Sequence, residues 1–375
     1  MDVLKTTDTP ILGVSAPSMA FIILFLSVSL FCYIMFRRID LLRKATPDPR
    51  FSNISTRLLR SLVYGFGQWR QPRYLGAGIL HILLFAGFII LSLRSLTLIG
   101  RGFSSTFHIP FLTGSLGFAY ESLKDYTVLV VLIVCIVAII RRAVFHPARY
   151  DHPGKKGHEH EAYVILGLVS ALMITDMIHD GSALKGLGSA SYNYCYRFPA
   201  ATFASLLMPE NQITALNVLH VGGYWAHILF FFALLNYLPM SKHFHVITAI
   251  PNVFFSNLKN GTIKPVRYGV SDWMELEQCG VSDLTGFTWK HILDFYSCAD
   301  CGRCTDNCPA NTVGRSLSPK MISVKARDYA YERFPVFGKL SHASETEKKL
   351  VGDIITEQEI WACTTCGACE AECPI

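Results

Sequence analysis

Residues 298–309 read CADCGRCTDNCP, and residues 363–374 read CTTCGACEAECP. Both stretches have the spacing C-x2-C-x2-C-x3-C-P, and they contain eight of the twelve cysteines of the chain. Gly302 and Gly367 occupy the same place in the two copies, where a residue without a side chain lets the backbone approach a bound group closely. The repeat therefore predicts a thiolate metal centre in the C-terminal part of the chain.

This spacing is typical of iron–sulfur proteins with two [4Fe–4S] clusters. Three closely spaced thiolates hold three corners of one cube, and the fourth cysteine, followed by proline, turns away to complete the other. The first cluster is thus predicted to bind Cys298, Cys301, Cys304 and Cys373, and the second Cys363, Cys366, Cys369 and Cys308. Zinc is the alternative, but it takes four thiolates as two separated pairs rather than in one run. The long spacer between Cys308 and Cys363 predicts inserted helices.

The rest of the chain is unusually apolar. Of its 375 residues, 17% are charged and 51% hydrophobic, and the mean hydropathy is +0.33. Soluble domains average about 25% charged residues. This composition excludes an ordinary cytosolic protein, a disordered chain and a nucleic-acid binder. The four remaining cysteines are isolated and are predicted to be inert: Cys32, Cys135, Cys195 and Cys279.

Five apolar segments precede the cysteine motifs. Each approaches the roughly 20 residues that a helix needs to cross a bilayer. They lie at positions 19–36, 75–93, 126–140, 162–178 and 213–238. We therefore expect an all-α protein with a five-helix transmembrane domain over residues 1–250 and a small, mainly helical cluster domain over 251–375.

The distribution of basic residues predicts the orientation. Residues 37–74 contain nine lysines and arginines and residues 141–161 contain five, whereas the alternate connections together contain six. Because positive residues stay on the cytoplasmic side, the N-terminus is predicted to lie outside. Five spans then bring the cysteine domain into the cytoplasm, beneath the plasma (inner) membrane.

Histidines lie within or beside the apolar segments, where ionisable side chains indicate function. The spacing of His227 and His245 corresponds to five full helical turns, so they would share a face of an unbroken helix, about 27 Å apart. That separation suits two stacked b hemes. Pro239 lies between them, and a kink there is the alternative. By depth in the membrane, His81 is predicted to pair with His245 and His179 with His227. A single heme between His81 and His227 is the competing arrangement.

Other histidines remain open to interpretation. His220 would line a quinone pocket or provide a third ligand, and His243 points away from the shared face. The loop HPARYDHPGKKGHEHE contains His146, His152, His158 and His160, and a solvated basic loop is favoured there over a metal site.

The segment TALNVLHVGGYWAHILFFFALLNYLPMSKHFHVITAIPNVFF, residues 214–255, resembles the last span of the nitrate reductase gamma cytochrome b subunit. In that family two histidines with this same spacing on the fifth helix each bind a heme, as His227 and His245 would here. The second helix of the family carries two further ligands. Here His81 is present, but Gln71 and Leu91 stand at the two possible partner positions.

Fusion of this domain to FTWKHILDFYSCADCGRC and CTTCGACEAECP resembles the membrane-bound iron–sulfur oxidoreductases related to heterodisulfide reductase. Some members are implicated in passing electrons from electron-transfer flavoprotein to menaquinone, and most continue into two cysteine-rich CCG domains. This chain stops at Ile375, so we expect the CCG part on a partner or elsewhere.

The resemblance implies a quinone-linked electron-transfer protein with two [4Fe–4S] clusters and one or two b hemes. Its implied partners are the lipid bilayer, menaquinone and a cytoplasmic electron-transfer flavoprotein or CCG-domain subunit. The alternatives are a non-catalytic anchor for a cytoplasmic reductase and a subunit that oxidises quinol in the reverse direction.

Overall fold

The computed structural model describes residues 13–147, 158–186, 197–210, 212–259, 283–338 and 349–375, together with Pro10, Asp272, Met274, Gly280 and Val281. The described residues form helices and connecting turns. Outside helices, two isolated bridges pair Thr46 with Thr288 and Val351 with Ile355 in this part of the chain. The expected all-α class is confirmed. Cys195, Cys279 and His152 lie outside the described residues, as does the side chain of His158.

Five helices are long and apolar enough to cross a membrane, and they coincide with the five predicted segments. They are α1 (Ala16–Lys44), α3 (Leu75–Arg101), α4 (Gly114–Phe145), α5 (His158–Gly186) and α7 (Ile213–Tyr237). Large apolar side chains on them are exposed, among them Phe21, Phe25 and Leu26 of α1 at 59%, 60% and 61% of their surface. Such apolar surface suits a lipid environment rather than water.

The chain divides into two compact units, and neither is a continuous stretch of sequence. Unit 1 comprises residues 1–31, 74–146 and 157–237, and unit 2 comprises residues 32–73, 147–156 and 238–375. The division into domains 1–250 and 251–375 remains a prediction, and the units cut across it. The second half of α1 and residues 45–73 belong with the cysteine motifs.

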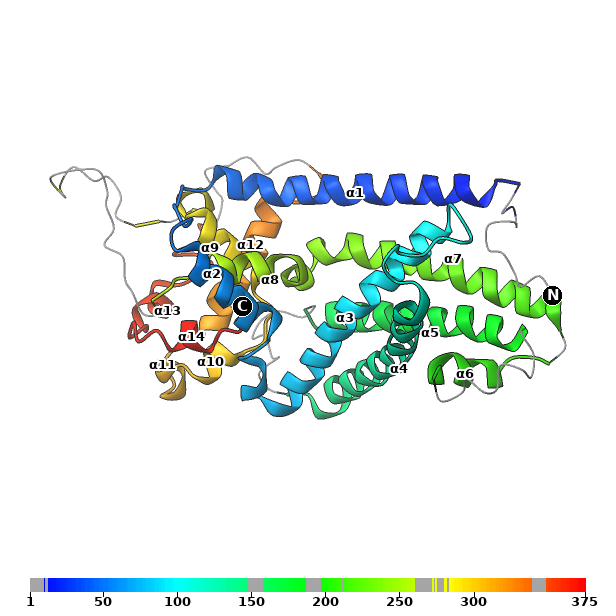
Figure 1. Ribbon diagram of the computed structural model, residues 1–375. Coiled ribbons are helices and arrows are strands. Elements are labelled where there is room, and N and C mark those ends of the chain that lie inside the picture. Colours follow the sequence, from blue (N-terminus) through cyan, green and yellow to red (C-terminus); the bar gives the residue numbers. More distant parts are fainter. Residues whose placement is uncertain are drawn as a thin grey trace. The chain divides into compact units, whose positions relative to one another are not determined.

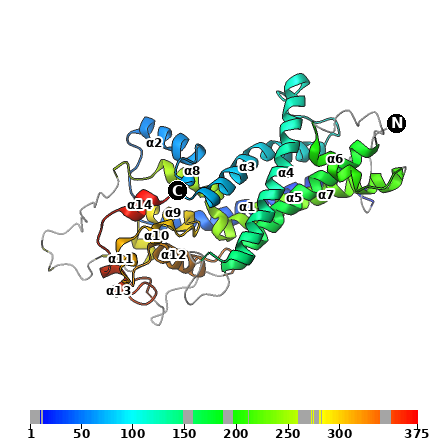
Figure 2. The same cartoon turned by 90° about the horizontal axis from the view of Figure 1, so that it is seen from below.

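In unit 1, α5 and α7 run side by side and share the most extensive helix contact (Figure 1). The helix α4 lies along α5 (Figure 2), and the short α6 (Pro199–Leu206) packs on both α4 and α5. Glycine permits the close approach of α7 to α5. A Cβ at Gly223 would lie 3.0 Å from the backbone nitrogen of His179.

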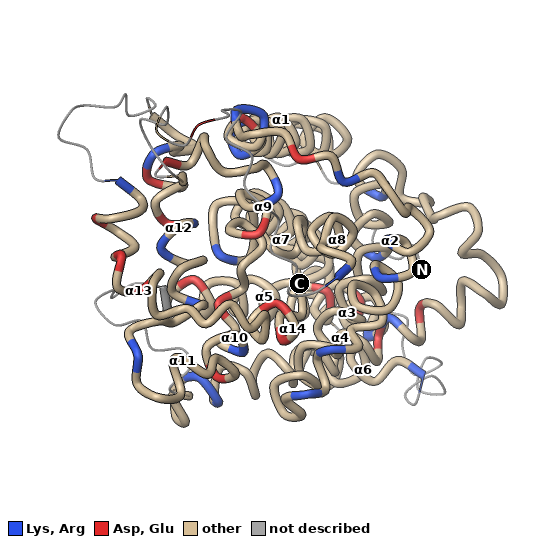
Figure 3. Tube along the Cα trace, turned by 90° about the vertical axis from the view of Figure 1, so that its left-hand side faces the viewer, with Lys and Arg blue, Asp and Glu red and all other residues tan. Residues whose placement is uncertain are grey.

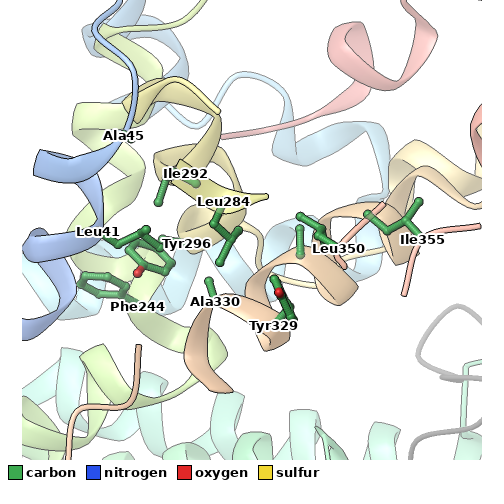
Figure 4. Close-up of a cluster of buried hydrophobic side chains, with 11 residues drawn as sticks. Leu41, Ala45, Phe244, Leu284, Ile292, Tyr296, Tyr329, Ala330, Leu350 and Ile355 are labelled. Atoms are coloured by element: carbon green, nitrogen blue, oxygen red, sulfur yellow. The ribbon is translucent and has the colours of Figure 1, made fainter. Parts of the chain in front are cut away.

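The helices of unit 2 pack around a main apolar core (Figure 4), and a smaller cluster lies around Cys308 and Ala362. The core joins side chains of α1, α9 (Trp289–Ser297) and α12 (Pro319–Arg333), among them Leu41, Tyr296 and Ala330. The helix α9 begins at Thr288, whose side chain accepts a hydrogen bond from the backbone of His291. The helix α12 begins at Ser318 in the same way, with proline in its first turn. Lysine, arginine and acidic residues follow one another along α12 (Figure 3).

The remaining helices of unit 2 are short. They are α2 (Ile54–Arg60), α8 (His245–Phe254), α10 (Arg303–Asp306), α11 (Pro309–Thr312), α13 (Glu357–Trp361) and α14 (Ala368–Glu372). A turn of π-helix follows α2 at Ser61–Phe66, and a 3₁₀ turn at Gln71–Arg73 precedes α3.

Candidate metal centres

The two cysteine motifs adopt the same backbone conformation. Asp300 and Thr365, each just before the second cysteine of its motif, have φ of 55° and 53°. Gly302 and Gly367, each just after that cysteine, have φ of 80° and 74°. Positive φ at a residue with a side chain is uncommon and strained. Its occurrence at equivalent places identifies the motifs as two copies of one loop.

Each loop then enters a short helix and leaves it in an extended conformation. The glycine of each copy caps the N-terminus of the helix, α10 or α14, and its carbonyl accepts the first backbone hydrogen bonds of that helix. The last cysteines, Cys308 and Cys373, have φ, ψ of −84°, 117° and −65°, 124°. Proline follows both, and it favours this extended conformation in the residue before it. The helices α10 and α14 pack against each other.

The thiols of the first loop gather with the last cysteine of the second. Burial raises the pKa of Cys304 to about 12, and the neighbouring thiols of Cys301 and Cys373 add to that increase. Burial and Cys301 likewise raise the pKa of Cys373 to about 11. Buried thiolates that repel one another need a positive partner, and iron would provide it. The donor set therefore fits a cluster.

The second loop is more open. Cys363, Cys366 and Cys369 are exposed. Burial raises the pKa of Cys369, and its neighbours Cys363 and Cys366 add to that shift. Cys308, from the first loop, is buried against Ala362, the residue immediately before Cys363.

In the described part of the chain, no three His, Cys, Asp or Glu side chains converge as the ligands of a single ion would. The thiolates of a [4Fe–4S] cluster each bind a different iron, so they lie farther apart than the ligands of one zinc ion. The arrangement does not match a ready-formed zinc site.

The first loop is held by the segment that precedes α3. Arg303 donates hydrogen bonds to the carbonyl of Arg70 at 2.7 Å and to the side-chain oxygen of Gln71 at 2.6 Å. Arg70 in turn donates to the carbonyl of Cys373 at 2.5 Å. Arg303 is 3% exposed, so these bonds satisfy a cation that is shielded from water. Sequence reasoning missed this contact, because Arg303 lies inside the motif and its partners lie far away in the sequence, before the second apolar segment.

His245 lies in unit 2, next to the first loop. It begins α8, and its ring Nδ1 donates to the carbonyl of Lys242 at 3.0 Å. The pKa of His245 is lowered, mainly because burial disfavours the charged ring. Asp300 acts to raise this pKa and Arg327 acts to lower it, so both charges of that pair act on the ring. The hydroxyl of Ser297, beside Cys298, donates to the hydroxyl of Thr248 on α8 at 2.9 Å.

The expected unbroken helix between His227 and His245 is wrong. The helix α7 ends at Tyr237, and two 3₁₀ turns, Leu238–Met240 and Lys242–Phe244, separate it from α8. Pro239 lacks a backbone N–H, and Ser241 caps a new turn by accepting from the backbone of His243. The spacing of the two histidines therefore does not place them on one helix face. His243 is half-buried, with its ring 5.8 Å from that of His245.

In unit 1, two of the membrane histidines form a stack. The rings of His179 on α5 and His220 on α7 lie 4.0 Å apart and 20° from parallel. The Nδ1 of each donates to the backbone carbonyl of the other, at 3.0 Å and 2.8 Å. The ring stacked on His179 is thus that of His220, and the predicted pairing of His179 with His227 at a heme stays a prediction.

His227 lies two helical turns further along α7, 2% exposed. Its Nδ1 donates to the carbonyl of Leu172 at 3.2 Å, and its Nε2 lies 3.5 Å from the hydroxyl of Ser95. His179, His220, His227 and His245 therefore share one protonation pattern, with Nδ1 donating to a carbonyl. This pattern leaves the lone pair on Nε2, as an axial heme ligand requires. His81 lies half-buried on α3, in unit 1, so its predicted pairing with His245 of unit 2 stays a prediction.

A buried ionic network joins α3, α4 and α5 near the stacked histidines. Arg94 donates to Asp176 at 2.8 Å and to Asp180 at 2.5 Å. Lys124 contacts the same two carboxylates. Both cations are about 2% exposed, and buried charges in a membrane protein must be paired. Sequence reasoning missed this network, although the spacing of four between Asp176, inside the fourth apolar segment, and Asp180, just after it, was an available signal.

Comparison with known proteins agrees with the cysteine chemistry. A family model described as a 4Fe-4S dicluster domain matches residues 297–375. The chain is 27% identical, over 93% of its length, to the probable iron-sulfur-binding oxidoreductase FadF of Bacillus subtilis. It is 25% identical, over 98% of its length, to the EtfAB:quinone oxidoreductase of Syntrophomonas wolfei.

The chain spans about half the length of these curated relatives, 52% and 54%. A shorter match, 35% identical over 26% of the chain and 16% of the relative, is to a probable membrane-anchored ferredoxin of Chromohalobacter salexigens. No solved structure matches the chain. The chain is therefore similar to proteins named as an iron–sulfur-binding oxidoreductase and an EtfAB:quinone oxidoreductase, and its residues 297–375 match a 4Fe-4S dicluster domain.

Proposed function

We propose that this protein transfers electrons between a cytoplasmic donor, of the electron-transfer flavoprotein or thiol–disulfide type, and the menaquinone pool. The observation that carries the proposal is the pair of identical cysteine loops in a chain with five membrane-length apolar helices. When bound, [4Fe–4S] clusters and b heme each supply one-electron redox chemistry. The name of the Syntrophomonas relative supports the quinone side of the proposal.

In the proposed ligand sets, each loop gives its first three cysteines to one cluster and its last cysteine to the other. Cys298, Cys301, Cys304 and Cys373 hold the first cluster, and Cys363, Cys366, Cys369 and Cys308 hold the second. The thiols of Cys301 and Cys373 act electrostatically on Cys304, which supports the first set, and Cys369 of the second set acts on it as well. The packing of Cys308 against Ala362 supports the second.

The proposed heme ligands are His81, His179, His227 and His245, for one or two b hemes. The carbonyl-bonded Nδ1 of the last three supports this role, because it orients the ring and makes Nε2 the ligand atom. His245 is the ligand most closely connected to the clusters, since the charges beside the first loop act on it.

The proposed topology has the N-terminus outside and unit 2 in the cytoplasm of a bacterial plasma membrane. The excess of lysine and arginine in residues 37–74 and 141–161 supports this orientation. Electrons would then enter at the clusters from a soluble partner and leave to quinone within the membrane.

The first test is a reduced-minus-oxidised visible spectrum of the detergent-purified chain, with non-heme iron, acid-labile sulfide and heme quantified. We expect about eight non-heme irons per chain and a b-type α-band. Iron and sulfide without heme would leave a membrane-bound ferredoxin and remove the heme part of the proposal. Absence of all cofactors would overturn the proposal in favour of an anchor.

Histidine variants sharpen the heme assignment. His81→Ala and His245→Ala should each lower the heme content, whereas His146→Ala, at the exposed end of α4, should not. Unchanged heme in both ligand variants would contradict the assignment. A variant that has lost its clusters but keeps its heme tests the quinone side. In proteoliposomes, menadiol should still reduce the heme of this variant, because the proposed quinone site lies in the membrane.

A further inference from the structure

A fully buried cation lies beside the first cysteine loop. Arg327 on α12 is 1% exposed, and its Nη1 donates to the carbonyl of Cys298 at 2.8 Å. The same guanidinium contacts both carboxylate oxygens of Asp300, at 3.1 Å and 3.3 Å. Asp300 is 3% exposed and is held at positive φ between Cys298 and Cys301.

This ion pair lies at the junction between the loop and α8. The charges of Arg327 and Asp300 both act on the ring of His245, the first residue of α8. The hydrogen bond from Ser297 to Thr248 joins the same two segments one turn further along. A buried charge placed there acts on both the cysteine loop and the predicted heme ligand, with little screening by water.

The second loop has no such carboxylate at the equivalent place. Thr365 takes the conformation of Asp300 but carries no charge. A strained backbone position with a buried carboxylate and a buried arginine is therefore specific to the first loop. A loop of this shape does not need the ion pair, because the second copy forms without that carboxylate.

We propose that Arg327 and Asp300 are positioning residues that set the reduction potential of the first cluster relative to the second. The inference rests on the proposed function, since it requires the clusters to be present. Reduction adds negative charge, so a buried cation favours it and a buried carboxylate opposes it. The two residues balance each other in the native chain.

Single substitutions should shift the potential in opposite directions. In Arg327→Gln the carboxylate of Asp300 stays buried without its cation, so the potential of the first cluster should fall. In Asp300→Asn the guanidinium keeps only the more distant Asp328, at 3.5 Å, as its anion, so the potential should rise. The double variant should return close to the native value, and Arg327→Lys should shift less than Arg327→Gln.

The experiment is a potentiometric titration of the full-length, detergent-purified chain followed by electron paramagnetic resonance. A Cys301→Ser variant identifies the signal of the first cluster, and the second cluster serves as an internal reference. Arg333→Gln removes a cation further along the same helix and should leave both potentials unchanged. Heme potential is followed in the same samples by its α-band.

Opposite shifts confined to the first cluster would support the proposal. Unchanged potentials, or shifts in the same direction, would overturn it even when the iron content is normal. If Arg327→Gln fails to retain its cluster, Asp300→Asn and Arg327→Lys decide the question. A native chain without iron–sulfur signals would instead refute the proposed function.

Discussion

The two cysteine loops share one backbone conformation but lie in different environments. Residues 298–309 and 363–374 match in spacing, in positive φ at two equivalent positions and in their short helices. Yet the cysteines at 363, 366 and 369 are exposed, whereas those at 298, 301, 304 and 308 are half-buried or buried. Both loops contact the segment before α3, the second through Arg70 and Cys373. Only the first loop carries its own arginine into that contact, Arg303, and a carboxylate, Asp300, that pairs with α12. The motif thus dictates the shape of the loop, and the flanking residues dictate its surroundings.

The largest expected effect is the loss of one iron–sulfur cluster. Cys301→Ser in the first loop and Cys366→Ser in the second should each remove about half of the non-heme iron, because each removes one ligand of a different cluster. Iron and sulfide analysis of the purified chains measures this. Cys32→Ser, at an isolated exposed cysteine of α1, is the control and should keep the full content. If each variant lost all of its non-heme iron, the two loops would hold a single shared site.

The next effect tests whether the first loop depends on its anchor. Arg303→Ala gives that loop the residue found at the equivalent position of the second, Ala368. It removes charged hydrogen bonds to Arg70 and Gln71, so we expect a loss of about 2–3 kcal/mol in stability. Thermal unfolding of the detergent-purified chain checks the loss. The reciprocal Ala368→Arg should give no stabilisation, and a Tm unchanged by Arg303→Ala would show that the anchor is dispensable.

A smaller effect tests the identity of the two backbones. Gly302→Ala and Gly367→Ala place a side chain at φ of 80° and 74°, so each should cost about 1–2 kcal/mol. Because the two loops share one backbone conformation, the two substitutions should lower the free energy of unfolding by similar amounts, despite the different burial of the loops. Chemical denaturation with the cofactors bound measures both. Gly76→Ala, where a Cβ meets no atom within 4 Å, is the matched helical control. A loss in only one loop would break the equivalence.

The smallest effect concerns the helix α13, which leads into the second loop. Thr356 and Glu359 form a capping box there, and Lys325 also bonds the Glu359 carboxylate. Burial alone would raise the pKa of Glu359, but these hydrogen bonds outweigh it and hold the pKa below its ordinary 4.5.

A lowered carboxyl pKa contributes stability above the ordinary value and loses it as the pH falls through the lowered value. Glu359→Gln should therefore destabilise the chain by about 1 kcal/mol at neutral pH. The difference from the native chain should shrink as the pH falls below 4.5 and vanish once the pH is below the lowered pKa of Glu359. Unfolding curves at pH 7 and at pH 4 or lower measure it. A difference that persists in acid would assign the effect to the shape of the side chain.

Local signals in the sequence were reliable, and long-range ones were not. The apolar segments and the cysteine spacing predicted five long helices and a dicluster region, because both depend on neighbouring residues. The helix through His227 and His245 failed because Pro239 and Ser241 interrupt it, and periodicity alone does not weigh such breaks. The stacking of His179 on His220 was not predicted, because the packing of α5 on α7 decides it. The bonds of Arg303 and Arg327 depend on tertiary contacts that no spacing encodes.

The network of Arg94, Lys124, Asp176 and Asp180 has a consequence for how the protein enters its membrane. A lone charged residue costs roughly 2.5–3.5 kcal/mol to insert at the centre of a helix and less toward its ends, where Arg94 and Lys124 lie. The helices α3 and α4 each bring a cation, and α5 brings the two carboxylates that neutralise them. The first two helices are therefore expected to remain incompletely released into lipid until α5 has been synthesised. We therefore expect the three helices to integrate into the membrane together, once the helix ending at Gly186 has been made.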